Sequence, residues 1–406
     1  MGYFKETLSG LGWMSTLRVI VRGLAIVKIA ILARILLPSQ FGTYGIALLV
    51  LGLLEMLTET GINVFLIQEK DTLEEYLDSA WVVSILRGIL ISIVILISVP
   101  FVVWFFGSPQ VSSLLYLIAG VGFIRGFINP MAVKFQKSLE FKKEFSFQSV
   151  LFLADAVVAI SIGVITKNES ALIWGMLAAA VLEIILSFVI FKKRPKFALD
   201  VSRVKKVVSA GKWVTGAGIF SYFFQNIDNI VIGRILGTSF LGLYQQVYRI
   251  STLPVSEVGQ IFNKVTFPVF VNIEGDRERL KTAYKKTLLI IFGLVFPFGL
   301  IVTFFPRPII LLILGPNWLP AEPVLRVLAI YGVVKSLLNS SYSLFLSVKL
   351  QKIVMLSELF GIIGIGILIF PLTSMYGILG AGYAALFGSL FCLPVILINF
   401  PKIFKK

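Results

Sequence analysis

The stretch ILARILLPSQFGTY at residues 31–44 returns as VIGRILGTSFLGLY at residues 231–244, half a chain further on. Six positions are identical in the two copies: Arg34, Ile35, Leu36, Ser39, Gly42 and Tyr44 match Arg234, Ile235, Leu236, Ser239, Gly242 and Tyr244. Both copies lie among long apolar runs. The repeat therefore predicts a polytopic membrane protein of two homologous halves, with a site where the halves meet, an architecture typical of transporters.

The composition places the chain in a membrane. Hydrophobic residues make up 57% of the 406 residues, charged residues 14%, and the mean hydropathy is +0.94, which is far from a soluble domain. The net charge of +16 comes from short basic runs between apolar segments, so we expect no nucleic-acid partner. With one cysteine, no histidine and no cofactor motif, we expect no cofactor, no metal and no catalytic residue.

Apolar stretches of about 20 residues, enough for a helix to cross a hydrocarbon core of about 30 Å, recur along the chain. They predict an all-α fold of twelve transmembrane helices, at roughly 12–36, 42–68, 79–105, 111–136, 145–166, 170–192, 210–236, 240–270, 284–305, 322–348, 353–374 and 378–401. Six helices per half give both halves the same orientation, so a pseudo-twofold axis should run along the membrane normal.

Basic residues set the expected orientation. They gather in alternate connections, as in the run Lys192, Lys193 and Arg194, whereas the opposite connections hold little beyond Lys167 and Arg307. Cytoplasmic loops are enriched in Lys and Arg, so both termini should lie in the cytoplasm and the chain in the cell (inner or plasma) membrane.

The duplication predicts three parts along the chain. Residues 1–193 should form an N-terminal six-helix lobe and residues 209–406 a C-terminal one. Between them, residues 194–208 place Phe197, Val201, Val204 and Val208 at helical spacing opposite Lys and Arg. That pattern suits a helix on the inner membrane surface, and a plain cytoplasmic linker is the alternative.

Ionisable residues inside the membrane are the candidate site, because an unpaired charge in hydrocarbon costs several kcal/mol. The first predicted helix carries Arg18, Arg22 and Lys28, and the second carries Glu55 and Glu59. In a hairpin, equal distance from the turn puts Arg22 level with the two glutamates, whereas Lys28 has no partner there. The cluster either pairs internally to fix the hairpin or lines a wet cavity whose surplus positive charge attracts a phosphate.

The seventh predicted helix carries a second polar cluster, Gln225, Asn226, Asp228 and Asn229. The same hairpin argument puts Asp228 within about a turn of Arg249 and predicts a buried pair; a seam of interhelical hydrogen bonds is the alternative. Without histidine, proton coupling would use carboxylates, with Asp228, Glu55 and Glu59 preferred. Three further acidic residues are interpreted as packing residues: Asp155, Glu183 and Glu358.

The motifs ARILLPSQFGTYG, ETGINVFLIQEKD, QNIDNIVIGRILGTSFLGLYQQVYRISTLP, VTFPVF and LGPNWLPAEPVLRVLAIYG occur in this order over nearly the whole chain. They resemble the Wzx-type polysaccharide (O-antigen) flippases of the multidrug/oligosaccharidyl-lipid/polysaccharide superfamily, in the branch of colanic and teichuronic acid exporters. The resemblance implies a V-shaped pair of six-helix lobes, with the first, second, seventh and eighth helices around a central cavity. Many relatives have fourteen helices, two more than predicted here.

The resemblance also implies the substrate and partners. The substrate would be a polyprenyl-pyrophosphate-linked oligosaccharide, moved to the outer leaflet by alternating access, with a proton or sodium ion as a possible coupling cation. Membrane lipids and a polysaccharide polymerase are further expected partners. One alternative is a cation-coupled multidrug antiporter, which needs an acidic and aromatic cavity. Others are a lipid II flippase, with two extra helices, and a membrane glycosyltransferase or polymerase, with catalytic carboxylates on a substantial loop.

Overall fold

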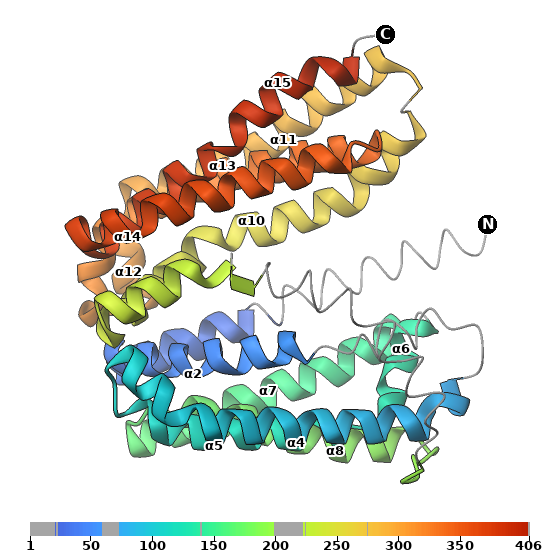
Figure 1. Cartoon of the computed structure of the whole chain (residues 1–406), viewed down its shortest axis with the longest axis vertical. Helices are drawn as coiled ribbons and strands as arrows, with labels where there is room; N and C mark the ends of the chain where they lie inside the picture. Colours follow the sequence, from blue (N-terminus) through green and yellow to red (C-terminus); the bar gives the residue numbers. More distant parts are fainter. Residues whose placement is uncertain are drawn as a thin grey trace. The chain divides into compact units, whose positions relative to one another are not determined.

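The structure is a computed structural model that describes residues 21, 23–58, 73–138, 140–198, 222–223, 225–273 and 275–404. These residues form helices joined by short connections (Figure 1). They divide into two compact units, residues 1–226 and residues 227–406. The all-helical architecture predicted from the sequence is confirmed. The predicted linker at 194–208 falls mostly outside the described residues, and the predicted lobe boundaries stay predictions.

The duplicated motif forms a helix, a break and a second helix in each unit. Residues 23–35 are helical, and α2 then spans Pro38–Leu57. Proline suits the first helical position because its missing N–H has no partner there in any case. In the second copy, residues 225–235 are helical and α10 spans Thr238–Asn272, after Gly237 at φ +83°. The two breaks therefore fall at the same place in the repeat but differ in backbone conformation.

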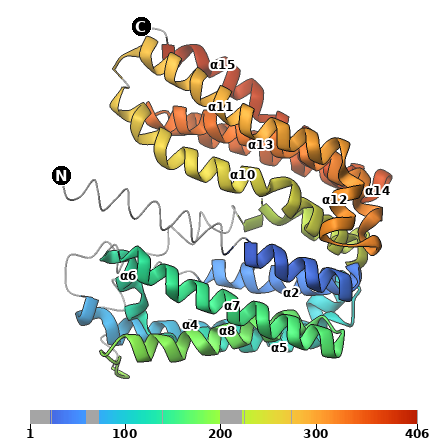
Figure 2. The ribbon, with the colours of Figure 1, turned by 180° about the vertical axis from the view of Figure 1, so that it is seen from behind.

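Unit 1 continues from α2 into a bundle of antiparallel helices. Its elements are α4 (Leu73–Phe106), α5 (Val111–Arg125), η1 (Pro130–Val133), α6 (Lys134–Lys137), α7 (Phe141–Thr166) and α8 (Ser170–Ile190). Helix α4 lies at the front of this unit in Figure 1, and α7 lies at the front in the reversed view (Figure 2). Between them, α4 packs against α5, α5 against α8, and α8 against α7.

One predicted helix is wrong. The sequence pattern predicts a single helix over 111–136, but α5 ends at Arg125 and the chain turns before η1. Pro130 disfavours helical backbone at the residue before it, and that residue, Asn129, adopts an extended conformation and accepts a hydrogen bond from the Met131 N–H at 3.0 Å. The apolar periodicity of the sequence continues across this break, so the periodicity alone does not indicate the turn.

Unit 2 is built around α13, which packs against α10, α11 and α14. After α10 come α11 (Arg277–Phe304), α12 (Pro306–Ile313), η2 (Pro316–Ala321), α13 (Glu322–Ser347), α14 (Gln351–Leu390) and α15 (Cys392–Phe404). Helix α14 is interrupted at Gly377, whose φ is +60°. Its two arms run antiparallel and touch through glycines: a Cβ on Gly388 would lie 2.7 Å from the Ile365 nitrogen.

Six helical runs of the described residues are long and apolar enough to cross a membrane: α2, α4, α7, α8, α11 and the run Gln351–Pro401. The bend at Gly377 divides the last run near the predicted gap between 374 and 378. Helices α7, α8, α11 and α13 also end within two residues of their predicted ends. The total of twelve spans and the pseudo-twofold axis remain outside what these residues establish.

The glycine contact in α14 gives a stability prediction. We expect Gly388→Val to lower the apparent melting temperature of the detergent-purified protein, because its side chain would overlap the backbone of the other arm and overpacking costs about 1–3 kcal/mol. Gly366→Val is the matched control, since a Cβ there meets nothing within 4 Å. Equal melting temperatures for the two variants would contradict the close approach.

Candidate functional site

Three predicted site residues, Arg18, Arg22 and Glu59, lie outside the described residues. The predicted contact between Arg22 and the glutamates therefore stays a prediction. The structure describes the other seven predicted site residues: Lys28, Glu55, Gln225, Asn226, Asp228, Asn229 and Arg249. Lys28, Glu55 and Asp228 each take part in a separate polar cluster, whereas Gln225 and Arg249 are exposed.

Lys28 has a partner that the hairpin argument did not find. Its ammonium nitrogen lies 2.5 Å from a carboxylate oxygen (Oδ2) of Asp155 on α7, and the two side chains are 13% and 17% exposed. Comparing successive helices could not reach a residue 127 positions away. Asp155, interpreted from the sequence as a packing residue, is half of a buried ion pair.

The second oxygen of Asp155 is in an unusual setting. Oδ1 is buried and has no hydrogen-bond partner among the described residues. Helix α8 closes off this oxygen, since a Cβ added to Gly175 would lie 2.5 Å from it. The ion pair is therefore only partly satisfied, and its stability depends on Lys28.

Removing one charge of this pair should destabilise the protein. Lys28→Met alone would leave a buried carboxylate unpaired, which costs about 3–5 kcal/mol, whereas replacing both partners by apolar residues is often nearly neutral. We expect Lys28→Met and Asp155→Leu each to lower the melting temperature, and the double variant to recover much of the loss. A double variant as unstable as the sum of the two single variants would rule out the pairing.

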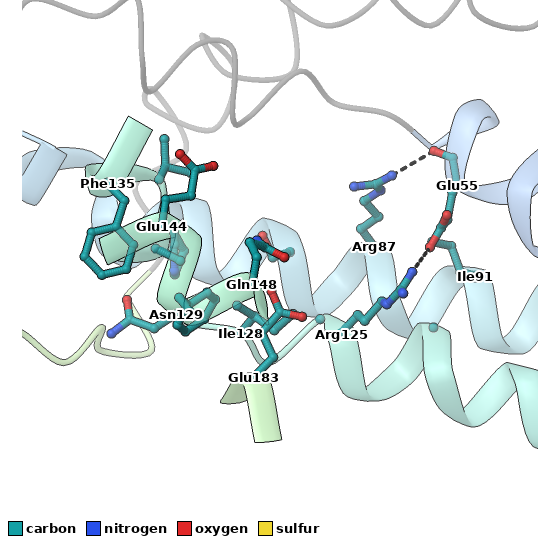
Figure 3. Close-up of a pocket in the computed structure, with 18 residues that line it drawn as sticks. Glu55, Arg87, Ile91, Arg125, Ile128, Asn129, Phe135, Glu144, Gln148 and Glu183 are labelled. Carbon is teal, nitrogen blue, oxygen red and sulfur yellow. Dashed lines mark hydrogen bonds and ion pairs between the residues drawn. The ribbon is translucent and has the colours of Figure 1, made fainter. Parts of the chain in front are cut away.

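Glu55 lies near the C-terminal end of α2 and is contacted by the side chains of two arginines (Figure 3). The Arg125 guanidinium of α5 is 2.8 Å from the Glu55 carboxylate. Arg87 of α4 donates to the Glu55 carbonyl at 2.7 Å and to the Thr58 hydroxyl at 3.2 Å. A guanidinium at a helix C-terminus satisfies carbonyls that have no partner within the helix and complements the helix dipole.

Sequence reasoning missed both arginines. Each is a lone cation within an apolar stretch, at ILRGIL for Arg87 and GFIRGF for Arg125, and an intramembrane charge is by default a candidate site. Glu55 was predicted to pair with the first helix, but among the described residues its carboxylate, on a side chain 36% exposed, pairs with Arg125 of α5.

These residues border a pocket inside unit 1 with a volume of about 450 Å³ (Figure 3). Its polar lining includes the carboxylates of Glu55, Glu144 and Glu183, the Gln148 amide and the Arg125 guanidinium. Glu183, interpreted from the sequence as a packing residue, lines this pocket. The pocket lies wholly within one unit.

Asp228 is the centre of a second cluster, in unit 2. The side chain is 9% exposed and its Oδ2 accepts a hydrogen bond from the Tyr244 hydroxyl at 2.9 Å. Its Oδ1 accepts from the backbone and side-chain nitrogens of Asn229, at 2.7 and 3.0 Å. Earlier in the same helix, Asn226 donates to the Tyr222 carbonyl at 2.9 Å and Gln225 is exposed.

The predicted pair between Asp228 and Arg249 is wrong. Arg249 is exposed, and the hydrogen bonds of the Asp228 carboxylate within the described residues come from Tyr244 and Asn229. Distance from a hairpin turn gives the depth of a residue but not the face it lies on. Arg249 is five positions after Tyr244 and therefore lies about 140° around α10 from it.

Lys335 on α13 completes this cluster and was also missed from the sequence. Its ammonium donates to the hydroxyls of Tyr331 and Tyr248, at 2.9 and 3.3 Å. It lies 5.2 Å from the centre of the Tyr331 ring, within the range of a cation–π contact. Since the Tyr248 ring packs on the Tyr244 ring, the polar cluster runs from Asp228 to Lys335 through three tyrosines.

The two copies of the repeat carry opposite charges at one position. In the alignment that matches Arg34 with Arg234, Lys28 corresponds to Asp228. Lys28 pairs with a carboxylate of unit 1, and Asp228 shares its cluster with a cation of unit 2.

The Tyr244 hydroxyl should stabilise the buried carboxylate of Asp228. Tyr244→Phe would remove a donor to a buried carboxylate and leave it underpaired, a loss of about 1–3 kcal/mol. We expect a lower melting temperature, with Tyr376→Phe as control because Tyr376 is 56% exposed in the same unit. If both variants melt with the wild-type protein, the Tyr244 hydroxyl does not support Asp228.

Solved structures share this fold. The lipid II flippase MurJ in an inward closed conformation matches with a TM-score of 0.74 and 15% identity, over 96% of this chain and 88% of that chain. An inward-facing multidrug resistance MATE family transporter of the MOP superfamily matches with a TM-score of 0.66 and 15% identity, over 96% and 94%. The chain therefore has the fold of this class of membrane transporters.

The family follows from the sequence match. The model of the family described as "Polysaccharide biosynthesis protein" matches residues 31–323, and the chain belongs to that family. Among its relatives are an uncharacterized membrane protein in the cps region of Klebsiella pneumoniae (29% identical, 84% of this chain, 71% of that one) and the lipopolysaccharide biosynthesis protein WzxC of Escherichia coli (25%, 86%, 71%). The teichuronic acid biosynthesis protein TuaB of Bacillus subtilis is 25% identical over 84% of this chain and 71% of its own.

Proposed function

We propose that the protein is a membrane flippase, not an enzyme, that carries a polyprenyl-pyrophosphate-linked oligosaccharide from the cytoplasmic to the outer leaflet by alternating access. One observation carries the proposal: a chain of the polysaccharide biosynthesis family has a transporter fold that a lipid II flippase shares. Relatives named for lipopolysaccharide, teichuronic acid and succinoglycan biosynthesis support the same class of substrate.

The chemistry of the substrate agrees with buried charge. A pyrophosphate and a chain of hydroxyl groups cannot enter hydrocarbon without partners, whereas the prenyl tail can stay in lipid. Cations and amides on the first and seventh helices would replace water around the head group. The translocation cavity would include Arg18, Arg22, Lys28, Glu59 and Asn226, together with the remaining predicted residues Glu55, Gln225, Asp228, Asn229 and Arg249.

The membrane arrangement belongs to the proposal as well. The protein would have twelve helices in two six-helix lobes, related by a twofold axis along the membrane normal. It would lie in the inner or plasma membrane of the cell, with both termini in the cytoplasm. The six long apolar runs and the bend at Gly377 support such a count. The lysine-rich ends of α6 and α7 support the orientation.

A coupling cation, a proton or sodium ion, would supply the energy, and a polysaccharide polymerase would remove the product. Asp228 is the carboxylate we favour for coupling, because it is buried and shares a hydrogen-bonded cluster with Lys335 through tyrosine hydroxyls. The acidic and aromatic character of this cluster also fits a multidrug antiporter, whose fold is similar, so the test includes that outcome.

Reconstitution tests the proposal. Vesicles containing the protein and a labelled polyprenyl-pyrophosphate oligosaccharide should show the label in the opposite leaflet, read out by an impermeant sugar-modifying enzyme. Protein-free vesicles and vesicles with the Gly388→Val variant are controls for leakage and misfolding. If label crosses equally fast without the protein, or if the protein moves only a cationic dye, the flippase proposal fails.

A further inference from the structure

We propose that the pocket inside unit 1 binds the sugar head group of the lipid-linked substrate. The inference rests on the proposed flippase function and adds a recognition site apart from the charged residues on the first and seventh helices. It starts from two groups that line the pocket, the Gln148 amide and the Glu183 carboxylate. Neither makes a hydrogen bond within the described part of the chain, and both side chains are only partly buried.

Planar polar groups of this kind suit hydroxyl groups. A carboxylate accepts short, charge-assisted hydrogen bonds from O–H donors, and an amide both donates and accepts. Arg125, with a side chain 41% exposed, adds N–H donors beyond the one that Glu55 takes. Phe135 and Phe147, whose ring centres are 6.0 Å apart, add an apolar wall for the C–H face of a sugar ring.

The charge balance favours hydroxyls over phosphate. Three glutamates line the pocket against two arginines, and Arg87 is engaged by the end of α2. Helix α5 also ends at the pocket, and the C-terminal end of a helix carries partial negative charge. A pyrophosphate would meet repulsion here, whereas hydroxyl donors would meet acceptors. The volume of about 450 Å³ lies within the range of about 300–1,000 Å³ usual for small-ligand pockets.

The pocket has a built frame. Asn129, with no exposed surface, donates from its backbone to the Ser187 hydroxyl at 3.2 Å and from its side chain to the Lys193 carbonyl at 3.1 Å. On another wall, α4 and α5 touch directly, since a Cβ on Gly126 would lie 2.9 Å from the Ser84 carbonyl. A shape fixed by such contacts is preorganised for a ligand.

The position of the pocket fits loading of the substrate. Several of its lining residues fall between Ile128 and Gln148, and the same segment of the chain carries Lys134, Lys137, Lys142 and Lys143 outside the lining. Lysine-rich connections lie on the cytoplasmic side of a membrane protein. Under the proposed function, a sugar head group enters the protein from this side.

Transport kinetics test the role of the two unpaired groups. We expect Gln148→Leu and Glu183→Gln to raise the KM for the lipid-linked oligosaccharide by about tenfold each, as for one lost hydrogen bond. Inhibition of this transport by sugar-free polyprenyl pyrophosphate should not change. Gln351→Leu and Glu358→Gln, exposed positions on α14, are matched controls. Pocket variants with a wild-type KM would overturn the inference.

Labelling gives a second readout that does not need transport. Cys392, the single cysteine of the chain, is buried and is first replaced by alanine. Ser84→Cys then places a thiol in the pocket lining, and Ser113→Cys is an exposed control. The lipid-linked oligosaccharide should slow labelling by N-ethylmaleimide at Ser84→Cys only, and sugar-free polyprenyl pyrophosphate should not.

The two experiments separate the proposals. Protection of Ser84→Cys without any leaflet transfer would reject the flippase function and keep the sugar site. Leaflet transfer by the wild-type protein with no protection at saturating lipid-linked oligosaccharide would reject the sugar site alone. Equal protection by the sugar-free lipid would show that the pocket binds the lipid or its pyrophosphate, and the inference would be wrong.

Discussion

Charged side chains inside these helical bundles must find protein partners, because hydrocarbon offers them none. Lys28 binds Asp155, Arg125 binds Glu55, and Asp228 takes the Tyr244 hydroxyl. The first two contacts join helices 127 and 70 residues apart in the sequence, and the third joins two consecutive helices. They therefore decide which helix faces meet inside each unit, and the apolar surface that remains can face lipid.

The sequence predicts well how far along its helix a residue lies, and poorly which face of the helix it occupies. Long apolar runs predicted the C-terminal ends of α7, α8, α11 and α13. The duplicated motif predicted a break followed by a new helix in each copy. Counting residues from a hairpin turn could not show that Arg249 and Tyr244 lie on different faces of α10. Nor could it show that the Lys28 side chain contacts Asp155 on α7. Such partners follow from how distant helices pack, which no local pattern contains. Arg87, Arg125 and Lys335 were readable in principle, as lone cations in apolar stretches.

The two copies of the repeat place the same residue type in different surroundings. Tyr44 and Tyr244 hold the same position, yet the hydroxyl of Tyr44 points to the Met176 sulfur and that of Tyr244 to a carboxylate. Together with the opposite charges of Lys28 and Asp228, this gives the two copies of the repeat different polar surroundings.

Direct backbone contact between helices, at Gly126 in unit 1 and Gly388 in unit 2, has a mechanical consequence. Glycine has no rotamers to freeze, so these helix pairs associate at little entropic cost. They also leave no gap into which a lipid tail could wedge. A displacement of one helix of such a pair is transmitted to the other without any side-chain rearrangement. Each pair therefore moves as one rigid element.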